Sequence, residues 1–155
     1  MDSRIIVGIT HGDINGVSYE VILKTLAEPK ITENIIPVIY GSSKVAAYYR
    51  KSLDIQGVNL NIVNNIAEIN PKKINLINCT DDELKVEIGK STEEAGKAAF
   101  EALERATADL KDGHLHALVT APINKKNIQT EEAETKKVQA GQGKYAGIKK
   151  TARGD

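Results

Sequence analysis

The sequence has no tryptophan, one phenylalanine and one cysteine among its 155 residues. A single cysteine, Cys79, excludes a disulfide within the chain and suits a reducing compartment. No apolar run approaches the roughly 20 residues that a membrane span requires, and the N-terminal residues lack the charged and apolar regions of a signal peptide. We therefore predict a soluble, cytoplasmic protein that does not bind membranes.

An excess of one charge is also lacking, because 21 lysine and arginine residues balance 21 aspartate and glutamate residues. Without a basic patch there is no reason to expect binding to nucleic acid. Since aromatic residues are scarce, the core must be built from isoleucine, leucine, valine and alanine, as is typical of buried parallel strands. A chain of this length can form one ordinary domain with a substantial core.

Segments typical of strands and of helices alternate along the chain. Short apolar runs predict strands at residues 5–9, 35–40, 58–63, 74–79 and 115–119, with a weaker one at 84–88. Helical spacing of apolar residues predicts helices at residues 19–26 and 44–53, and a long one with a stripe of alanines that ends near Lys111. This alternation predicts an α/β fold with a mainly parallel sheet flanked by helices.

Proline and serine predict where several of these elements begin or end. Pro29 should end the helical pattern that precedes it. Pro37 either places its strand toward an edge of the sheet or lies at the start of that strand. One of the serines at positions 42–43 is expected to cap the helix that follows them. Ser91 begins a pattern typical of a capping box and is expected to cap the long helix.

Two polar turns follow predicted strands, one at residues 10–18 and one at residues 120–126. Because the carboxyl ends of parallel strands meet at one edge of a sheet, both turns are expected to lie there, where open α/β sheets bind ligands. In the first turn, Gly12 and Gly16 permit backbone conformations and close approaches that a Cβ would prevent. The residues alone leave two interpretations, a ligand site or a turn built for structural reasons.

Individual side chains in these turns also have two interpretations each. Asp13 either orients polar groups at the site or caps the turn. His11 either points into a cleft as a hydrogen-bond donor or is satisfied within the turn. Lys125 either attracts a phosphate group or is a solvated loop lysine. Cys79 is expected to be a small core residue.

Three blocks of residues recur together in one known family. The first is Ile9-Thr10-His11-Gly12-Asp13 with Gly16 and Glu20, where that family typically has Ile-Thr-x-Gly-Asp-Pro-Ala-Gly-Ile-Gly-Pro-Glu. The second is Gly89 followed by Gly96-Lys97-Ala98-Ala99, and the third is Ala117-Leu118-Val119-Thr120-Ala121-Pro122-Ile123-Asn124-Lys125. In this order and spacing, residues 4–129 resemble the N-terminal part of the 4-hydroxythreonine-4-phosphate dehydrogenase family.

The resemblance implies a fold similar to that of the isocitrate and isopropylmalate dehydrogenases, and a homodimer when the protein is full length. It implies NAD-dependent oxidation and decarboxylation of 4-phosphooxy-L-threonine in pyridoxal phosphate biosynthesis, with a divalent metal as Lewis acid. It also implies which residues line the cleft and contact a phosphorylated substrate: His11, Gly12, Asp13, Gly16, Thr120, Asn124 and Lys125.

The chain also departs from the family pattern. Ile14-Asn15 replaces Pro-Ala, Ser18-Tyr19 replaces Gly-Pro, and the Gly-His-Thr-Glu segment and three metal-binding histidines of the family have no counterpart. We therefore expect residues 1–129 to form the N-terminal α/β segment and residues 130–155 a polar tail, disordered or not the family's own continuation. The chain is expected to be a truncated form without activity of its own. The alternative is a small non-catalytic α/β module that binds a phosphorylated or anionic ligand.

Overall fold

The computed structural model describes residues 3–80 and 83–123. The predictions for Asn124, Lys125 and the tail at 130–155 therefore lie outside the described residues. Within the described ranges, no helix has the length and apolar character needed to cross a bilayer.

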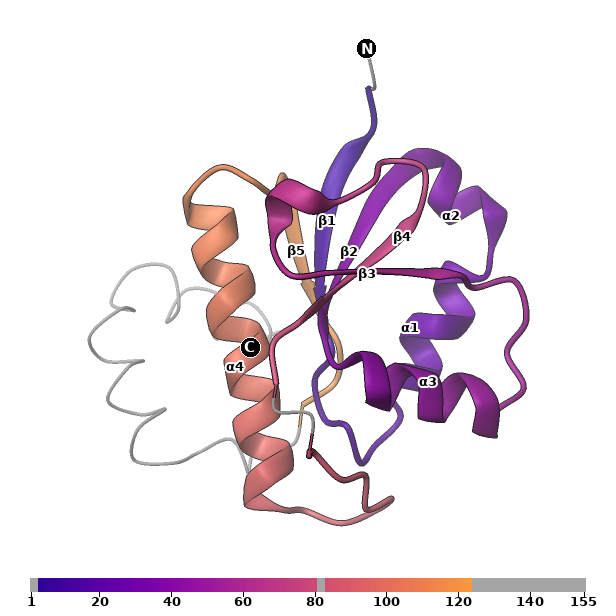
Figure 1. Ribbon diagram of the computed structural model, residues 1–155, viewed down its shortest axis with the longest axis vertical. Coiled ribbons are helices and arrows are strands. Elements are labelled where there is room, and N and C mark those ends of the chain that lie inside the picture. The colour runs from indigo at the N-terminus through magenta and orange to yellow at the C-terminus, as the bar shows by residue number, and fades with distance from the viewer. Residues whose placement is uncertain (1–2, 81–82, 124–155) are drawn as a thin grey trace, which may run out of the picture.

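One sheet forms the centre of the molecule (Figure 1). It has five strands in the order β3-β4-β2-β1-β5, and every pair of neighbours is parallel. The strands are β1 (Ile5–Thr10), β2 (Ile35–Gly41), β3 (Leu60–Val63), β4 (Ile74–Asn78) and β5 (Ala117–Thr120). The predicted α/β fold with a parallel sheet is thus confirmed.

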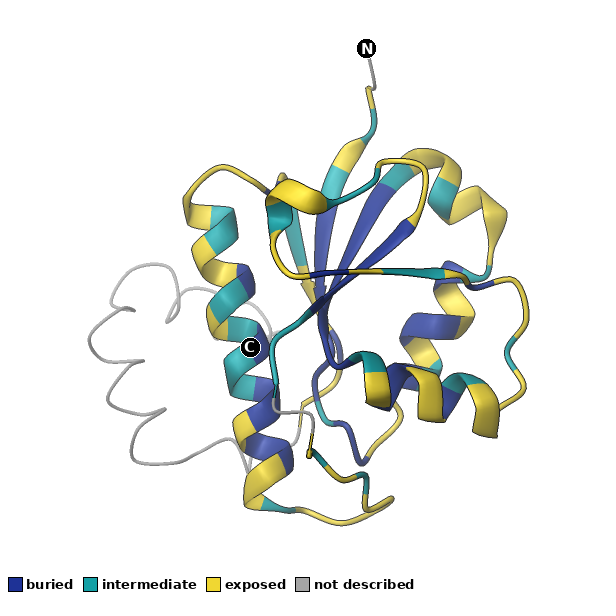
Figure 2. Ribbon diagram, viewed as in Figure 1, coloured by how far each residue is buried: buried dark blue, intermediate teal, exposed yellow. Residues whose placement is uncertain are grey.

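Helices cover both faces of the sheet. They are α1 (Ser18–Leu26), α2 (Pro29–Asn34), α3 (Ser43–Ser52) and α4 (Glu93–Lys111), with a short 3-10 turn η1 (Ile66–Glu68). In Figure 1, α1, α2 and α3 lie on one side of the sheet and α4 lies on the other. Figure 2 shows the buried residues concentrated in the strands and on the sides of α1 and α4 that face them.

Alternation within β2 explains why the core has two parts. Ile39 belongs to the apolar cluster shared with α1 and α3, whereas Val38 and Tyr40 belong to the cluster shared with α4. Successive side chains of a strand point to opposite faces, so an uninterrupted apolar run such as β2 supplies both clusters. The alanine stripe of α4 lets that helix pack closely on the sheet, and Ala102 and Ala106 are fully buried.

The two prolines take positions that the sequence pattern only partly predicted. Pro29 does not simply end a helix, because it is the first residue of α2, where its missing N–H costs no hydrogen bond. Pro37 does not lie at a sheet edge, because β2 runs between β1 and β4. Nor is it the first residue of the strand, because Ile35 and Ile36 precede it in β2; it lies where β2 pairs with β1 alone, since the pairing with β4 begins only at Val38. The carbonyl oxygen of Pro37 accepts a hydrogen bond from the side-chain amide of the buried Asn75 at 3.3 Å.

Other boundary predictions were right at one helix and wrong at the next. Ser42 caps α3 by accepting the N–H of Val45, as one of the two predicted serines should. The long helix is capped by Thr92 rather than Ser91, because the Thr92 hydroxyl accepts the N–H of Ala95.

Two strand predictions also need correction or refinement. Residues 84–88 form no strand. The strand predicted at residues 115–119 is β5, which within the described residues lies at an edge of the sheet, with Val119 53 % exposed.

Candidate functional site

The two polar turns meet at the carboxyl edge of the sheet. Thr10 ends β1 and pairs with Thr120, which ends β5. Beyond these ends, the N–H of Asp13 donates a hydrogen bond to the carbonyl oxygen of Pro122 at 2.8 Å. For residues 120–123, the described part of the second turn, this confirms that both turns share one edge.

Gly12 makes this close approach possible. Its φ of +63° lies in the left-handed region that favours glycine. A Cβ at this position would lie 2.8 Å from the carbonyl oxygen of Ala121 and nearer still to that of Pro122. Gly16 is less constrained, because it is exposed and a Cβ there would come no closer than 3.2 Å to the Asp13 carboxylate.

Asp13 organises the first turn from within. Its Oδ1 accepts the N–H of Asn15 at 3.1 Å, and its carbonyl oxygen accepts the Ser18 hydroxyl at 2.5 Å and the N–H of Gly16 at 3.2 Å. The side chain is half-buried at the rim of the edge. This geometry matches the turn-capping alternative, and it holds the carboxylate where the two turns meet.

Of the two interpretations of His11, the structure matches the one in which the ring is satisfied inside the protein and does not face a cleft. The residue is 0 % exposed, and both ring nitrogens are engaged, Nδ1 with the Tyr19 hydroxyl at 2.7 Å and Nε2 with the Ala98 carbonyl oxygen at 2.9 Å. Burial lowers the pKa of His11 to about 4, against the opposing effect of the Ala98 carbonyl. The ring is therefore neutral, with its proton on Nε2 facing the carbonyl and with Tyr19 donating to Nδ1.

Tyr19 completes the same buried network, although it is not among the site residues predicted from the sequence. Its hydroxyl accepts the N–H of Ser42 at 3.0 Å, and its ring stacks on Tyr49 with centroids 5.6 Å apart. Gly41 leaves room for this arrangement, since a Cβ there would lie 2.5 Å from the Tyr19 hydroxyl and 2.9 Å from His11 Nδ1. Burial raises the pKa of Tyr19, which keeps the hydroxyl protonated. The signal in the sequence was its position, where the family pattern has proline.

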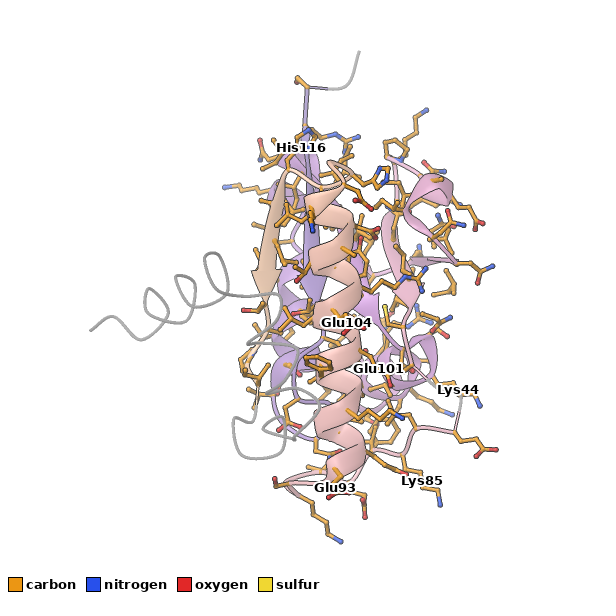
Figure 3. All side chains as sticks on the ribbon, turned by 90° about the vertical axis from the view of Figure 1, so that its left-hand side faces the viewer. Lys44, Lys85, Glu93, Glu101, Glu104 and His116 are labelled. Atoms are coloured by element: carbon orange, nitrogen blue, oxygen red, sulfur yellow. The ribbon has the colours of Figure 1, made fainter. Side chains whose placement is uncertain are left out.

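The remaining histidines lie far from this edge. His116 sits just before β5, and Figure 3 places it at the end of the molecule opposite Glu93, where α4 begins. Its Nδ1 accepts the N–H of Ile6 at 2.9 Å, so it extends the β1–β5 pairing.

Residues 3–80 and 83–123 contain no group of three histidine, cysteine or acidic side chains that could hold a metal. The described residues by themselves therefore do not fit a divalent metal.

Thr120 and Cys79 differ in burial. Thr120, at the end of β5, is exposed at the edge where the turns meet. Cys79 is partly buried against the cluster under α4, and burial raises the pKa of its thiol to about 12. Such a thiol is not a nucleophile at neutral pH, in agreement with its predicted role as a small core residue.

A parallel α/β sheet with polar turns joined at the carboxyl ends of neighbouring strands is typical of enzymes that bind small ligands at that edge. Residues 33–149 match the family described as "Pyridoxal phosphate biosynthetic protein PdxA". The chain belongs to this family of dehydrogenases, whose solved members have the isocitrate dehydrogenase-like fold.

Individual relatives agree with this assignment. The chain is 55% identical over 131 residues to 4-hydroxythreonine-4-phosphate dehydrogenase of Bacteroides thetaiotaomicron, covering 84% of this chain and 36% of the relative. It is 41% identical over 125 residues to the protein of that name from Sulfurihydrogenibium sp., covering 79% and 37%. The crystal structure of the Klebsiella pneumoniae enzyme superimposes with a TM-score of 0.75 at 27% identity, covering 84% and 40%. The chain thus spans well under half the length of these relatives.

Proposed function

We propose that this chain supplies one part of a dehydrogenase that acts on 4-hydroxythreonine 4-phosphate (4-phosphooxy-L-threonine) in pyridoxal phosphate biosynthesis. The hydrogen bond between Asp13 and Pro122 is the observation that carries the proposal, because it joins the two family blocks into one edge. The two relatives described above are named for this activity, which supports the proposal. In this proposal the edge contacts the phosphorylated substrate.

The reaction requires two changes at the substrate. Its secondary alcohol loses a hydride to NAD and a proton to a base, which leaves a β-keto acid, and that acid then loses carbon dioxide. In the proposal, Gly12 lets the two turns meet, the exposed Gly16 lets the backbone approach the substrate, and the exposed Thr120 hydroxyl donates to it. Asn124 and Lys125, which lie outside the described residues, are proposed to bind the phosphate. The proposal includes a homodimer in the cytoplasm.

A chimera tests the proposal most directly. The segment of the Bacteroides thetaiotaomicron relative that matches this chain is replaced by this chain's own residues, and NADH formation is followed with 4-hydroxythreonine 4-phosphate. We expect activity from the chimera and none from the 155-residue chain alone. A folded but inactive chimera, or NADH formation by the chain alone, would contradict the proposal.

The chimera assay together with a binding measurement distinguishes this proposal from the alternative, a non-catalytic module that binds an anion. Titration calorimetry of the chain with 4-hydroxythreonine 4-phosphate measures binding without chemistry. Saturable binding by the chain together with an inactive chimera would favour the binding module. An active chimera would exclude it.

A further inference from the structure

Asn15 connects the first polar turn to a second turn far along the chain. Residues 87–90 form a β-turn in which the N–H of Lys90 donates to the carbonyl oxygen of Glu87 at 3.0 Å. Its third residue, Gly89, has a φ of +78°, as a type II turn requires. This turn occupies the segment where sequence analysis predicted a strand to end.

The Asn15 side chain binds both ends of that turn. Its Oδ1 accepts the N–H of Glu87 at 2.7 Å, and its Nδ2 donates to the carbonyl oxygen of Lys90 at 3.1 Å. The backbone adds a third link, because the N–H of Gly89 donates to the Asn15 carbonyl oxygen at 2.8 Å. Since Oδ1 faces a donor and Nδ2 faces an acceptor, only one orientation of the amide satisfies these partners.

The same amide reaches the start of α4. Nδ2 lies 3.4 Å from the hydroxyl oxygen of Thr92, the residue that caps this helix. Asn15 is 1 % exposed, so an unsatisfied amide there would carry a desolvation penalty. The arrangement therefore joins three parts of the protein: the first polar turn, the turn at 87–90 and the N-terminus of α4.

We propose that Asn15 is a positioning residue that holds the turn at 87–90 against the first polar turn, so that both meet the substrate as one preformed unit. This inference rests on the proposed function. The family pattern has alanine at this position, and alanine can make none of the side-chain bonds described above. Ordering a loose loop on binding weakens affinity, so loss of Asn15 should act on substrate binding more than on the chemical step.

Hydrogen exchange tests the positioning without any activity. In the 155-residue chain, Asn15→Ala should speed exchange of the Glu87 and Gly89 amides and leave the amides of β1 and β2 unchanged. Asn15→Asp keeps the acceptor for Glu87 and loses the donated bonds, so it should preserve protection at Glu87 more than Asn15→Ala does. Asn59→Ala, at an exposed asparagine, is the matched control and should change neither amide.

Kinetics of the chimera test the functional part. Asn15→Ala should raise KM for 4-hydroxythreonine 4-phosphate about tenfold, as loss of buried hydrogen bonds of this kind predicts, with kcat little changed. Asn15→Asp should give a smaller rise, and Asn59→Ala none. Unchanged exchange at Glu87 and Gly89, or faster exchange with unchanged KM, would overturn the positioning role. An inactive parent chimera would instead defeat the proposed function and leave the exchange result standing.

Discussion

His11 follows β1 directly, and its imidazole ring is enclosed between α1 and α4. A histidine at the end of a strand next to glycine and aspartate resembles a site residue in sequence, yet here both nitrogens are used inside the protein. The neutral ring joins Tyr19 to Ala98 and so ties two helices on opposite faces of the sheet to the first polar turn.

The depressed pKa of His11 predicts how stability depends on pH. The folded value of about 4 lies below the ordinary value of 6.5, so between these values the unfolded chain binds more protons than the folded one. The free energy of unfolding should therefore fall as pH decreases through this range, by up to about 3 kcal/mol from this group. Urea unfolding of the wild type and of His11→Gln, at about pH 7 and about pH 4.5, measures the effect.

His11→Gln should show a shallower loss of stability toward acid than the wild type, whatever its stability at neutral pH. His114→Gln is the control, because His114 is exposed, and its pH dependence should match the wild type. Equal pH dependence in all three proteins would mean that folding does not change the pKa of His11.

At the scale of elements, the helix boundaries show which local patterns are decisive. Ser42 and Thr92 both accept an N–H three residues later, which is the geometry of an N-cap. Ser91 has the better sequence pattern, but the helix begins one residue later. The Asn15 amide lies near the Thr92 hydroxyl and the Lys90 carbonyl, and these contacts set the starting point from outside the helix.

The capping residue of α4 can be identified by substitution. Thr92→Ala should lower the free energy of unfolding by about 1 kcal/mol, because the N–H of Ala95 loses its partner. Ser91→Ala should change it by less than about 0.5 kcal/mol, as expected for an exposed position outside the helix. Chemical denaturation of the two variants checks this, and a larger loss at Ser91 would restore the capping box predicted from sequence.

At the scale of the whole molecule, helices cover both faces of the sheet, and within the described residues β3 and β5 are its edge strands. β5 pairs with β1 on one side, and on its other side no strand lies within the residues that the structure describes. Val119 on this edge strand is 53 % exposed. Unpaired, apolar strand edges tend to pair with other chains.

We expect this edge to promote association of the 155-residue chain. Val119→Lys should lower the fraction of associated protein in sedimentation velocity, because a charged side chain on an edge strand opposes pairing. Ile88→Lys is the control, since Ile88 is 66 % exposed but lies in a turn. If Ile88→Lys reduced association as much as Val119→Lys, exposed apolar surface in general would be responsible, and not the strand edge.

Local pattern in the sequence determined the five strands that form, the main helices and the shared edge of the two turns, although it also predicted a strand at residues 84–88 that does not form. Uninterrupted apolar runs such as β1 and β2 can be satisfied only as strands buried on both faces, and parallel strands necessarily end on the same side. These features depend on neighbours in sequence, which is why they could be predicted.

Only the tertiary structure decided what individual polar residues do. His11 is internal because α4, more than eighty residues later in the chain, brings the Ala98 carbonyl to its ring. Asn15 is a connecting residue because the turn at 87–90 folds over it. Hydrogen-bond partners so distant in sequence leave no local pattern, so whether a side chain faces a ligand or the protein interior depends on the packing of the whole molecule.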